Sequence, residues 1–233
     1  LAAMVVLGSD AFAAKVETLE GLAFGKLSAR EVKVYVPDAV TTHTPVLVAL
    51  DGQNMDAWKL TEALAEVARR GREVPLVVAI PSGADRVEEY GLAETLDFAG
   101  RGTKAAAFQR WVVGTVLPAV RARYALTADP ARTGVMGSSL GGLAAFDLAW
   151  RFPGKFGWAG SFSGSFWWRG ENGSPAVKQA SRLTHRLVRE STARPATQRW
   201  WFSVGTKEET EDRDGNGVID VVQDTTELID ALA

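Results

Sequence analysis

Cysteine is absent from the 233-residue sequence, and histidine occurs only twice, as His43 and His185. The absence of cysteine excludes disulfides, zinc–thiolate sites, iron–sulfur clusters and thiol nucleophiles from this chain. Two histidines leave few options for a histidine-based metal site. The sequence also lacks any run of eighteen consecutive apolar residues, so we expect no membrane span. It has no basic run, and with a formal net charge of −2 we expect no nucleic-acid partner.

The composition is that of a globular protein, because 46% of the residues are hydrophobic and only 23% are charged. Without repeats or a low-complexity linker, the sequence predicts one domain over residues 14–233. Residues 1–13 differ from the rest. An apolar run at residues 1–7 and small residues at 11–14 are typical of a secretory signal and its cleavage site. We therefore expect a signal-peptide remnant and an exported protein, periplasmic or extracellular; the alternative is an ordinary first helix or strand.

Strands and helices alternate after residue 15. The apolar runs at 46–50 and 74–80 are typical of strands buried on both sides, and the 103–124 helix is expected to be interrupted near Pro118. The alternation predicts an α/β fold with a mainly parallel central sheet and helices on both faces. Strands are predicted at 31–37, 46–50, 74–80, 132–136, 156–162 and 200–204, and helices at 56–70, 103–124, 140–151 and 177–190.

A G-x-S-x-G motif centred on Ser139 lies between the predicted 132–136 strand and the 140–151 helix. A nucleophile at such a tight turn is strained, and glycines two residues before and after it prevent side-chain collisions. The helix that follows offers free N–H groups to a developing oxyanion. The motif therefore favours Ser139 as a nucleophile. The alternative is a glycine-rich turn needed only for close packing.

The segment Asp51-Gly52-Gln53-Asn54 follows the buried 46–50 strand. Ligand sites in open α/β sheets lie at the carboxyl ends of parallel strands, and α/β-hydrolases take an oxyanion donor from such a loop. We interpret the N–H groups of Gln53 and Leu140 as the oxyanion hole. A simple turn before the next helix is the alternative.

The segments VLVALDGQN, TGVMGSSLGGLAAFDLAWRFPGKFG and SGSFWW resemble an esterase family of α/β-hydrolases. That family includes enterochelin-type, feruloyl and acetyl-xylan esterases and mycolyltransferases. The resemblance covers residues 32–204. It implies an eight-stranded α/β-hydrolase sheet, a Ser–acid–His triad in that chain order, and a small-molecule or carbohydrate-linked ester as substrate. It also implies that Glu208, after the 200–204 strand, is the acid. Glu209 and Asp212 are possible substitutes, and a merely solvated acidic loop is the alternative.

The histidine that this triad requires does not follow Glu208. We expect His43 and His185 to be ordinary surface residues rather than catalytic bases. The resemblance places the base after one more helix and strand, whereas the sequence stops within the predicted helix TTELIDALA. We therefore expect a C-terminally incomplete domain that lacks its last strand and histidine loop. A Ser–acid–His triad without its base loses most of its catalytic rate, so a non-catalytic ester- or glycan-binding module is one alternative function. An acyltransferase of the same fold is another.

An acidic segment after Glu209 matches most of the calcium-binding loop pattern D-x-[DN]-x-[DN]-G. Oxygen ligands at alternate positions, with glycine at the sixth, wrap a chain around a hard cation. Gln223 stands where a bidentate Glu belongs, which weakens the match. No cofactor is required for ester chemistry, so we expect at most a structural calcium, and a metal-free surface turn is the alternative. The candidate ligands are Asp212, Asp214, Asn216, Val218 and Asp220.

Aromatic residues cluster at 162–168 and at 200–201. They either line an acyl pocket beside the serine or pack in the core, and the sequence does not distinguish these two arrangements. Arg86, Glu89 and Tyr90 follow the 74–80 strand and could face the same cleft.

Overall fold

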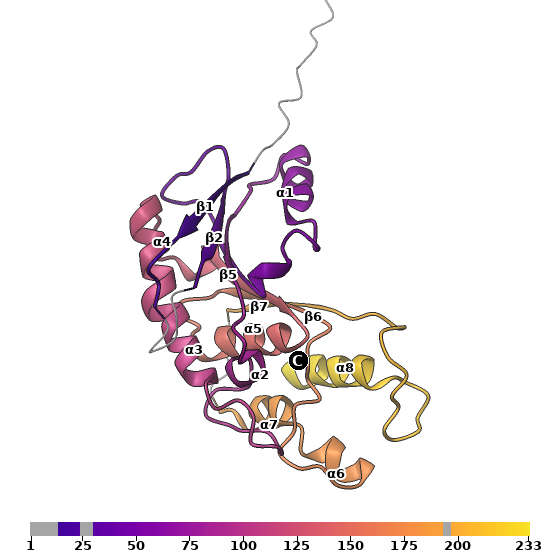
Figure 1. Ribbon diagram of the computed structural model, residues 1–233. Helices are drawn as coiled ribbons and strands as arrows, with labels where there is room; N and C mark the ends of the chain where they lie inside the picture. Colours follow the sequence, from indigo (N-terminus) through magenta and orange to yellow (C-terminus); the bar gives the residue numbers. More distant parts are fainter. Residues whose placement is uncertain (1–13, 24–29, 193–196) are drawn as a thin grey trace, which may run out of the picture.

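A computed structural model describes residues 14–23, 30–192 and 197–233 (Figure 1). These residues form one seven-stranded sheet in the order β1-β2-β4-β3-β5-β6-β7. The β1–β2 and β2–β4 pairs are antiparallel, and the five strands from β4 to β7 are parallel. The mainly parallel sheet is therefore confirmed, with seven described strands where the resemblance implied eight. The strands are β1 Lys15–Leu19, β2 Val32–Val36, β3 Val46–Leu50, β4 Leu76–Ile80, β5 Thr133–Ser138, β6 Trp158–Phe162 and β7 Arg199–Ser203.

Eight α-helices lie around this sheet in the described part of the chain, and α8 packs beside α7 (Figure 1). None of them is long and apolar enough to cross a membrane. The described residues also contain two short 3-10 turns, Gly52–Asn54 and Pro130–Arg132, and a π-helical segment, Val112–Val116. The α-helices are α1 Leu60–Arg69, α2 Arg86–Glu89, α3 Ala105–Trp111, α4 Leu117–Tyr124, α5 Leu140–Arg151, α6 Pro175–Ala180, α7 Leu183–Glu190 and α8 Asp220–Leu232.

Two predicted helices differ from those observed. The 56–70 helix begins only at Leu60, because Lys59 before it has a left-handed φ of 53°. The 103–124 helix is interrupted near Pro118, as expected, by a π-helical segment, Val112–Val116, that ends two residues before this proline. The predicted 177–190 helix is two helices, α6 and α7, because the backbone of Arg182 is extended and forms an isolated β-bridge with Arg169. The strand β1 and the short helix α2 were not predicted.

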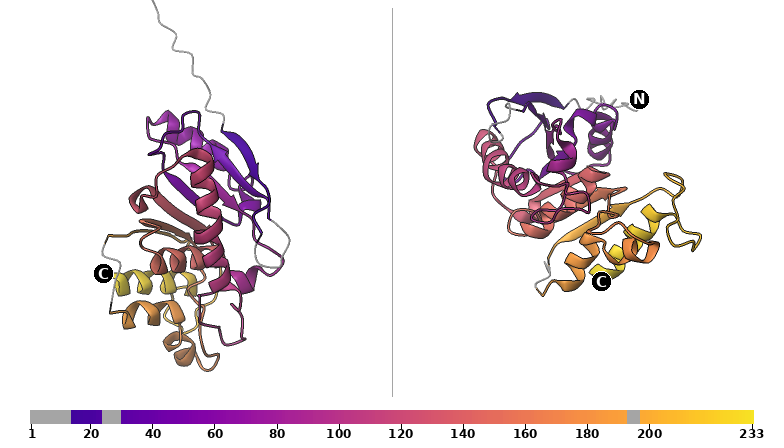
Figure 2. Two further views of the ribbon diagram at one scale, coloured as in Figure 1. Left: turned by 90° about the vertical axis from the view of Figure 1, so that its left-hand side faces the viewer. Right: turned by 60° about the horizontal axis from the view of Figure 1, so that its bottom comes forward.

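The two faces of the sheet are covered unequally. Val46, Val48 and Leu50 of β3 belong to the larger core cluster, which also contains residues of α3, α4 and α5. Ala49 points to the opposite face, into a smaller cluster with residues of α1. Figures 1 and 2 show α1 on the other side of the sheet from α3 and α4. Helices on both faces are thus confirmed around β3 and β4.

The β6–β7 part of the α1 face is open within the described residues. Phe162 at the end of β6 is 40% exposed, and Trp201 in β7 is 66% exposed. The predicted signal-peptide remnant, residues 1–13, lies outside the described residues.

Candidate active site

Ser139 lies at the turn between β5 and α5, as its motif predicted. It is exposed, and its backbone has a φ of 56° and a ψ of −123°. A non-glycine residue in this region is strained, and such strain concentrates at functional sites. A Cβ on Gly137 would lie 2.3 Å from the carbonyl oxygen of Gly141. The first glycine of the motif therefore lets the start of α5 pack directly against the end of β5.

The segment after β6 holds this turn in place. The N–H of Ser139 donates to the carbonyl of Phe162 (3.0 Å), and the N–H of Ser165 donates to the carbonyl of Ser139 (3.0 Å). The Oγ atoms of Ser139 and Ser165 are 3.3 Å apart, and Ser165 is only 3% exposed. Ser165 was not predicted as a site residue, although it lies within the SGSFWW segment that carries the resemblance.

Gln53 and Leu140 lie at the carboxyl ends of neighbouring parallel strands, β3 and β5. Gln53 is in the 3-10 turn after β3, and Leu140 is the first residue of α5. The first N–H groups of a helix have no intrahelical acceptor, so both are available to an oxyanion. The Gln53 side chain is tied to Ser82 after β4, with its Nε2 donating to Ser82 Oγ (2.9 Å) and its Oε1 accepting from the Ser82 N–H (3.0 Å).

An ion pair links the loop after β3 to the end of β5. Arg86 donates through Nε to Asp51 Oδ1 (2.7 Å) and through Nη2 to Asp51 Oδ2 (2.6 Å), and Nη2 also reaches the Ser138 carbonyl (3.3 Å). The Asp51 N–H donates to the hydroxyl of Tyr90 (3.1 Å). Burial raises the pKa of Tyr90, so this hydroxyl stays protonated at neutral pH. Of the three residues considered for the cleft, Arg86 is half-buried beside this loop, whereas Tyr90 is fully buried and Glu89 is buried in an ion pair with Arg30. The contacts of Asp51 were not predicted.

The two adjacent glutamates of the loop after β7 point to different partners. Glu208 Oε1 accepts from Ser163 Oγ (2.7 Å) and from the Gly205 N–H (2.6 Å), so it faces the segment that contacts Ser139. Glu209 Oε1 instead accepts from the N–H of Val221 in α8 (2.6 Å), and burial raises its pKa. Of the two, Glu208 is therefore the one that bonds to the segment after β6.

Neither histidine contacts Ser139. His43 is exposed in the turn before β3, at the amino end of the strands, whereas Ser139 lies at their carboxyl end. The prediction that His185 is a surface residue was wrong: it is 1% exposed on α7, and its Nε2 lies 2.8 Å from the Asp224 carbonyl oxygen. Because α7 is amphipathic and packs against α8, this face of the helix is buried. Burial and the charge of Arg182 lower the pKa of His185 to about 3, so its imidazole is neutral.

The predicted calcium ligands lie in the loop before α8 and, for Asp220, at its first residue, and the side chains of all but Val218 accept hydrogen bonds within the protein. Asp212 accepts from the N–H groups of residues 215, 216 and 217, at 2.8 to 3.1 Å. Asp214 accepts from Gln223, Asn216 from the Val218 N–H, and Asp220 from the Arg213 N–H. No group of three acidic or histidine side chains that could hold a metal occurs among the described residues.

The clustered aromatics divide between core and surface. Phe166 and Trp168 are fully buried, and Trp200 packs against Phe146 with 4.7 Å between the ring centroids and the ring planes tilted by 34°. Phe162 instead borders an apolar cavity of about 530 Å³ on the α1 face, together with Met136 and Ser138.

Residues 28–233 match the profile of a family described as "Putative esterase". The chain is 26% identical to the uncharacterized protein YbbA of Bacillus subtilis (strain 168) over 193 residues, 78% of this chain and 70% of that protein. It is 33% identical to the iron(III) salmochelin esterase of Escherichia coli O6:H1 over 149 residues, 62% of this chain and 34% of that protein.

Solved structures show the same fold at low sequence identity. The enterobactin esterase FES from Shigella flexneri matches with a TM-score of 0.72 at 20% identity, over 94% of this chain and 50% of that one. A ferulic acid esterase matches with a TM-score of 0.65 at 16% identity, over 95% of this chain and 86% of that one. The chain thus spans about half the length of the enterobactin esterase structure and about a third of the salmochelin esterase.

Proposed function

The chain belongs to the esterase family of α/β-hydrolases, and from that premise we propose that it hydrolyses carboxylic esters with Ser139 as the nucleophile. The observation that carries this proposal is the exposed serine held at a positive φ between β5 and α5. A strained turn of this kind is maintained by the surrounding packing, and it presents Oγ at the carboxyl edge of the sheet.

In the proposed reaction, Ser139 Oγ attacks the ester carbonyl as a general base takes its proton. The N–H groups of Leu140 and Gln53 stabilise the oxyanion, the alcohol leaves with a proton, and water then hydrolyses the acyl-enzyme. Glu208 is proposed to orient the base. That base is not His43 or His185, and the histidine expected beyond residue 233 stays a prediction.

We propose positioning roles for Arg86 and Ser165. Arg86 ties Asp51, which precedes the oxyanion loop, to the Ser138 carbonyl, which precedes the nucleophile. Ser165 contacts both the carbonyl and the hydroxyl of Ser139. These contacts support a turn that is fixed before substrate arrives, which is the condition for electrostatic stabilisation of a transition state.

The proposed substrates are small-molecule esters. The salmochelin and enterobactin esterases among the relatives make a siderophore ester one candidate, and a carbohydrate-linked ester or acyl transfer to a sugar is a second. Export is also part of the proposal, on the strength of residues 1–13.

Labelling with a fluorophosphonate probe tests the nucleophile. We expect the probe to modify the complete protein, base included, and Ser139→Ala to abolish the modification, because only an activated serine attacks the phosphorus centre at a useful rate. Ser138→Ala is the matched control, since it removes the neighbouring hydroxyl and should leave labelling intact. Labelling that persists in Ser139→Ala would show that another residue reacts. No labelling at all would favour the non-catalytic ester- or glycan-binding module.

A structural calcium in the loop before α8 is a separate proposal. Thermal unfolding of chelator-treated protein, with and without excess calcium, measures it. Calcium should raise the melting temperature, because a ligand that binds only the folded state stabilises it. Asp212→Asn should remove the rise. An unchanged melting temperature in the parent chain would contradict calcium binding.

A further inference from the structure

A single turn after β6, residues 162–165, contacts both the candidate nucleophile and the candidate acid. Its first and last residues bond Ser139: the carbonyl of Phe162 accepts the Ser139 N–H, and Ser165 contacts the carbonyl and the hydroxyl of Ser139. Its second residue, Ser163, donates through Oγ to Glu208 Oε1 (2.7 Å). The two groups that a catalytic base must bond are therefore both attached to one turn of four residues.

The backbone of Ser163 has an unusual conformation. Its φ is 47°, in the left-handed region that a residue with a Cβ seldom adopts. Its N–H donates to the carbonyl of Ser203 at the end of β7 (2.7 Å). Gly164 follows, and a Cβ added there would lie 2.4 Å from Ser161 Oγ. Strain of this kind persists only where the surrounding structure enforces it. The Ser163 hydroxyl therefore reaches the loop after β7 from a turn that is fixed by its packing.

The carboxylate of Glu208 is bound through one of its two oxygens. Oε1 accepts from Ser163 Oγ and from the Gly205 N–H (2.6 Å), and a Cβ added to Gly205 would lie 2.6 Å from this oxygen. Glu208 is exposed, and its Oε2 accepts no hydrogen bond from the described residues. Two donors on Oε1 hold the carboxylate in place and leave Oε2 available to a base.

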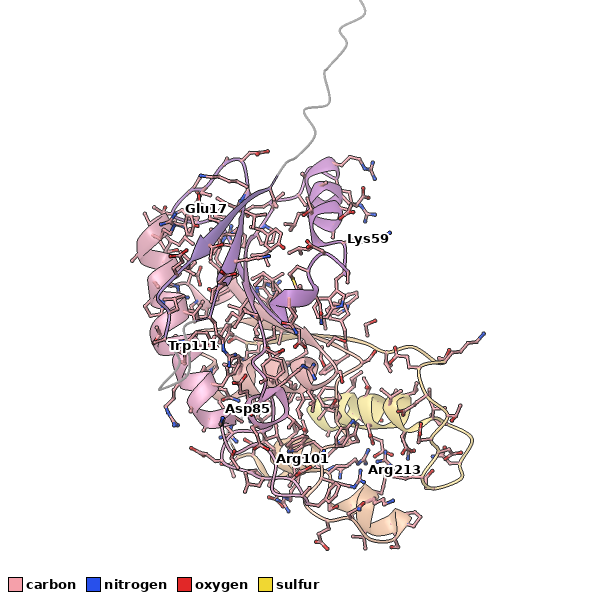
Figure 3. The ribbon with its side chains drawn as sticks, in the orientation of Figure 1. Glu17, Lys59, Asp85, Arg101, Trp111 and Arg213 are labelled. Carbon is pink, nitrogen blue, oxygen red and sulfur yellow. The ribbon has the colours of Figure 1, made fainter. Side chains whose placement is uncertain are left out.

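The loop that carries Glu208 has separate anchors on α8. Glu209 accepts from a backbone N–H of α8 (2.6 Å), and Arg213, which is labelled in Figure 3, pairs with Asp224 of the same helix. Loss of the Ser163 hydroxyl should therefore release the Glu208 carboxylate without detaching the loop from α8. The hydroxyl thus controls the direction of one carboxylate, which is the property that orienting a base requires.

We propose that Ser163 is a positioning residue for ester hydrolysis, whose hydroxyl fixes the Glu208 carboxylate so that Oε2 faces the base. This inference rests on the proposed function, in which Ser139 is the nucleophile and Glu208 the acid. The hydrogen bond has its effect in the transition state, when the base carries a positive charge that a correctly directed carboxylate stabilises. Ser163 acts through Glu208 and not on the substrate.

Hydrolysis of p-nitrophenyl acetate by the complete protein, base included, tests this role. Ser163→Gly removes the hydroxyl and suits the positive φ. It should lower kcat roughly tenfold, because a hydrogen bond to a charged group is lost, and leave KM unchanged. The melting temperature should stay within about 3 °C of the parent, since glycine adopts this backbone conformation without strain. Ser163→Asn should restore most of the lost kcat, because asparagine tolerates a positive φ and supplies an amide N–H donor.

Ala125→Gly is the matched control. Ala125 also has a positive φ, of 52°, but it has no polar side chain to lose. It lies at the end of α4, and two residues later Thr127 donates to Thr42 in the turn before β3, at the amino end of the strands. Because Ser139 lies at the opposite end of the sheet, Ala125→Gly should leave kcat unchanged.

A double-mutant cycle with Glu208→Gln distinguishes positioning from a merely structural role. If Ser163 acts through Glu208, Ser163→Gly should lower kcat by less than about twofold when Glu208 is already replaced. An unchanged kcat in Ser163→Gly, or the same fold-loss in both backgrounds, would overturn the proposal.

The outcomes also separate this inference from the proposed function. Hydrolysis that needs Ser139 and Glu208 but not Ser163 refutes the inference alone. Hydrolysis that needs Ser139 but not Glu208 refutes the acid and the role of Ser163 together, and leaves the nucleophile in place. A complete protein without Ser139-dependent hydrolysis refutes the proposed function, and the role of Ser163 falls with it.

Discussion

At the scale of single residues, Ser139 depends on glycines that make room for its backbone. Its φ of 56° is unusual for a side chain with a Cβ, and it is maintained by hydrogen bonds to Phe162 and Ser165. Gly137 and Gly141 lie so close that a methyl group on the first would overlap the backbone of the second. The spacing of the motif is therefore a packing requirement as much as a chemical one.

Gly137→Ala should destabilise the protein by roughly 2 kcal/mol or more, because the added methyl group has no space and must displace the start of α5. Gly154→Ala is the control: a methyl group added there would have nothing within 4 Å of it, so the change should stay within about 0.5 kcal/mol. Urea unfolding followed by circular dichroism measures both. Equal stability of the two variants would show that the turn relaxes without cost.

At the scale of elements, α7 and α8 are joined by a buried polar network. Arg182 donates to Asp224 and Glu227, Arg213 also pairs with Asp224, and His185 bonds the Asp224 carbonyl oxygen. Because a carbonyl oxygen can only accept, the Nε2 of His185 carries the hydrogen, and its Nδ1 has no partner among the described residues. Protonating this ring would bury a further positive charge near Arg182 and Arg189, whose charges already lower its pKa.

Lowering the pH should therefore reduce the free energy of unfolding through His185. Its folded pKa of about 3 lies below the usual 6.5, so the unfolded chain binds more protons between these values and stability falls as pH drops through this window. From pH 7 to pH 5 the loss from this group is about 2 kcal/mol. The glutamine of His185→Gln keeps a donor toward Asp224 but cannot titrate. The free energy of unfolding of this variant should therefore fall correspondingly less between pH 7 and pH 5. Urea unfolding of both proteins at the two pH values measures the difference, and parallel losses would contradict this assignment.

At the scale of the whole molecule, the sheet has one well-covered face and one that is covered in part. The alternation of β7 shows this directly. Trp200 packs on Phe146 and Trp150 in the larger core, whereas Trp201, the next residue, is 66% exposed on the α1 face. The two adjacent tryptophans therefore lie on opposite faces of the sheet.

Trp200→Ala should cost about 2–3 kcal/mol of unfolding free energy, because it leaves a space beside two aromatic rings. Trp201→Ala should stay within about 0.5 kcal/mol, since little of this side chain is buried. Thermal and urea unfolding of the pair compare the two faces within one strand. A large loss from Trp201→Ala would mean that the α1 face over β7 is covered in solution.

Local sequence patterns predicted much of the fold, because they act over short distances. The apolar run of β3 and the helix α5 have the expected boundaries, and the turn at Ser139 follows from its glycines. The start of α1 was misplaced because a left-handed Lys59 leaves no such pattern. The strand β1 was missed because an edge strand carries little hydrophobic alternation.

The sequence by itself determined the fold class, the family resemblance and the candidate nucleophile, since these depend on residues adjacent in the chain. Only the tertiary structure decided that Glu208 rather than Glu209 faces the Ser139 side, that His185 is buried, and that Asp51 and Arg86 are paired. These facts rest on contacts between residues 12 to 45 positions apart, or on which helix face meets a neighbour. Side-chain direction and burial are set by packing between elements, which no short stretch of sequence encodes.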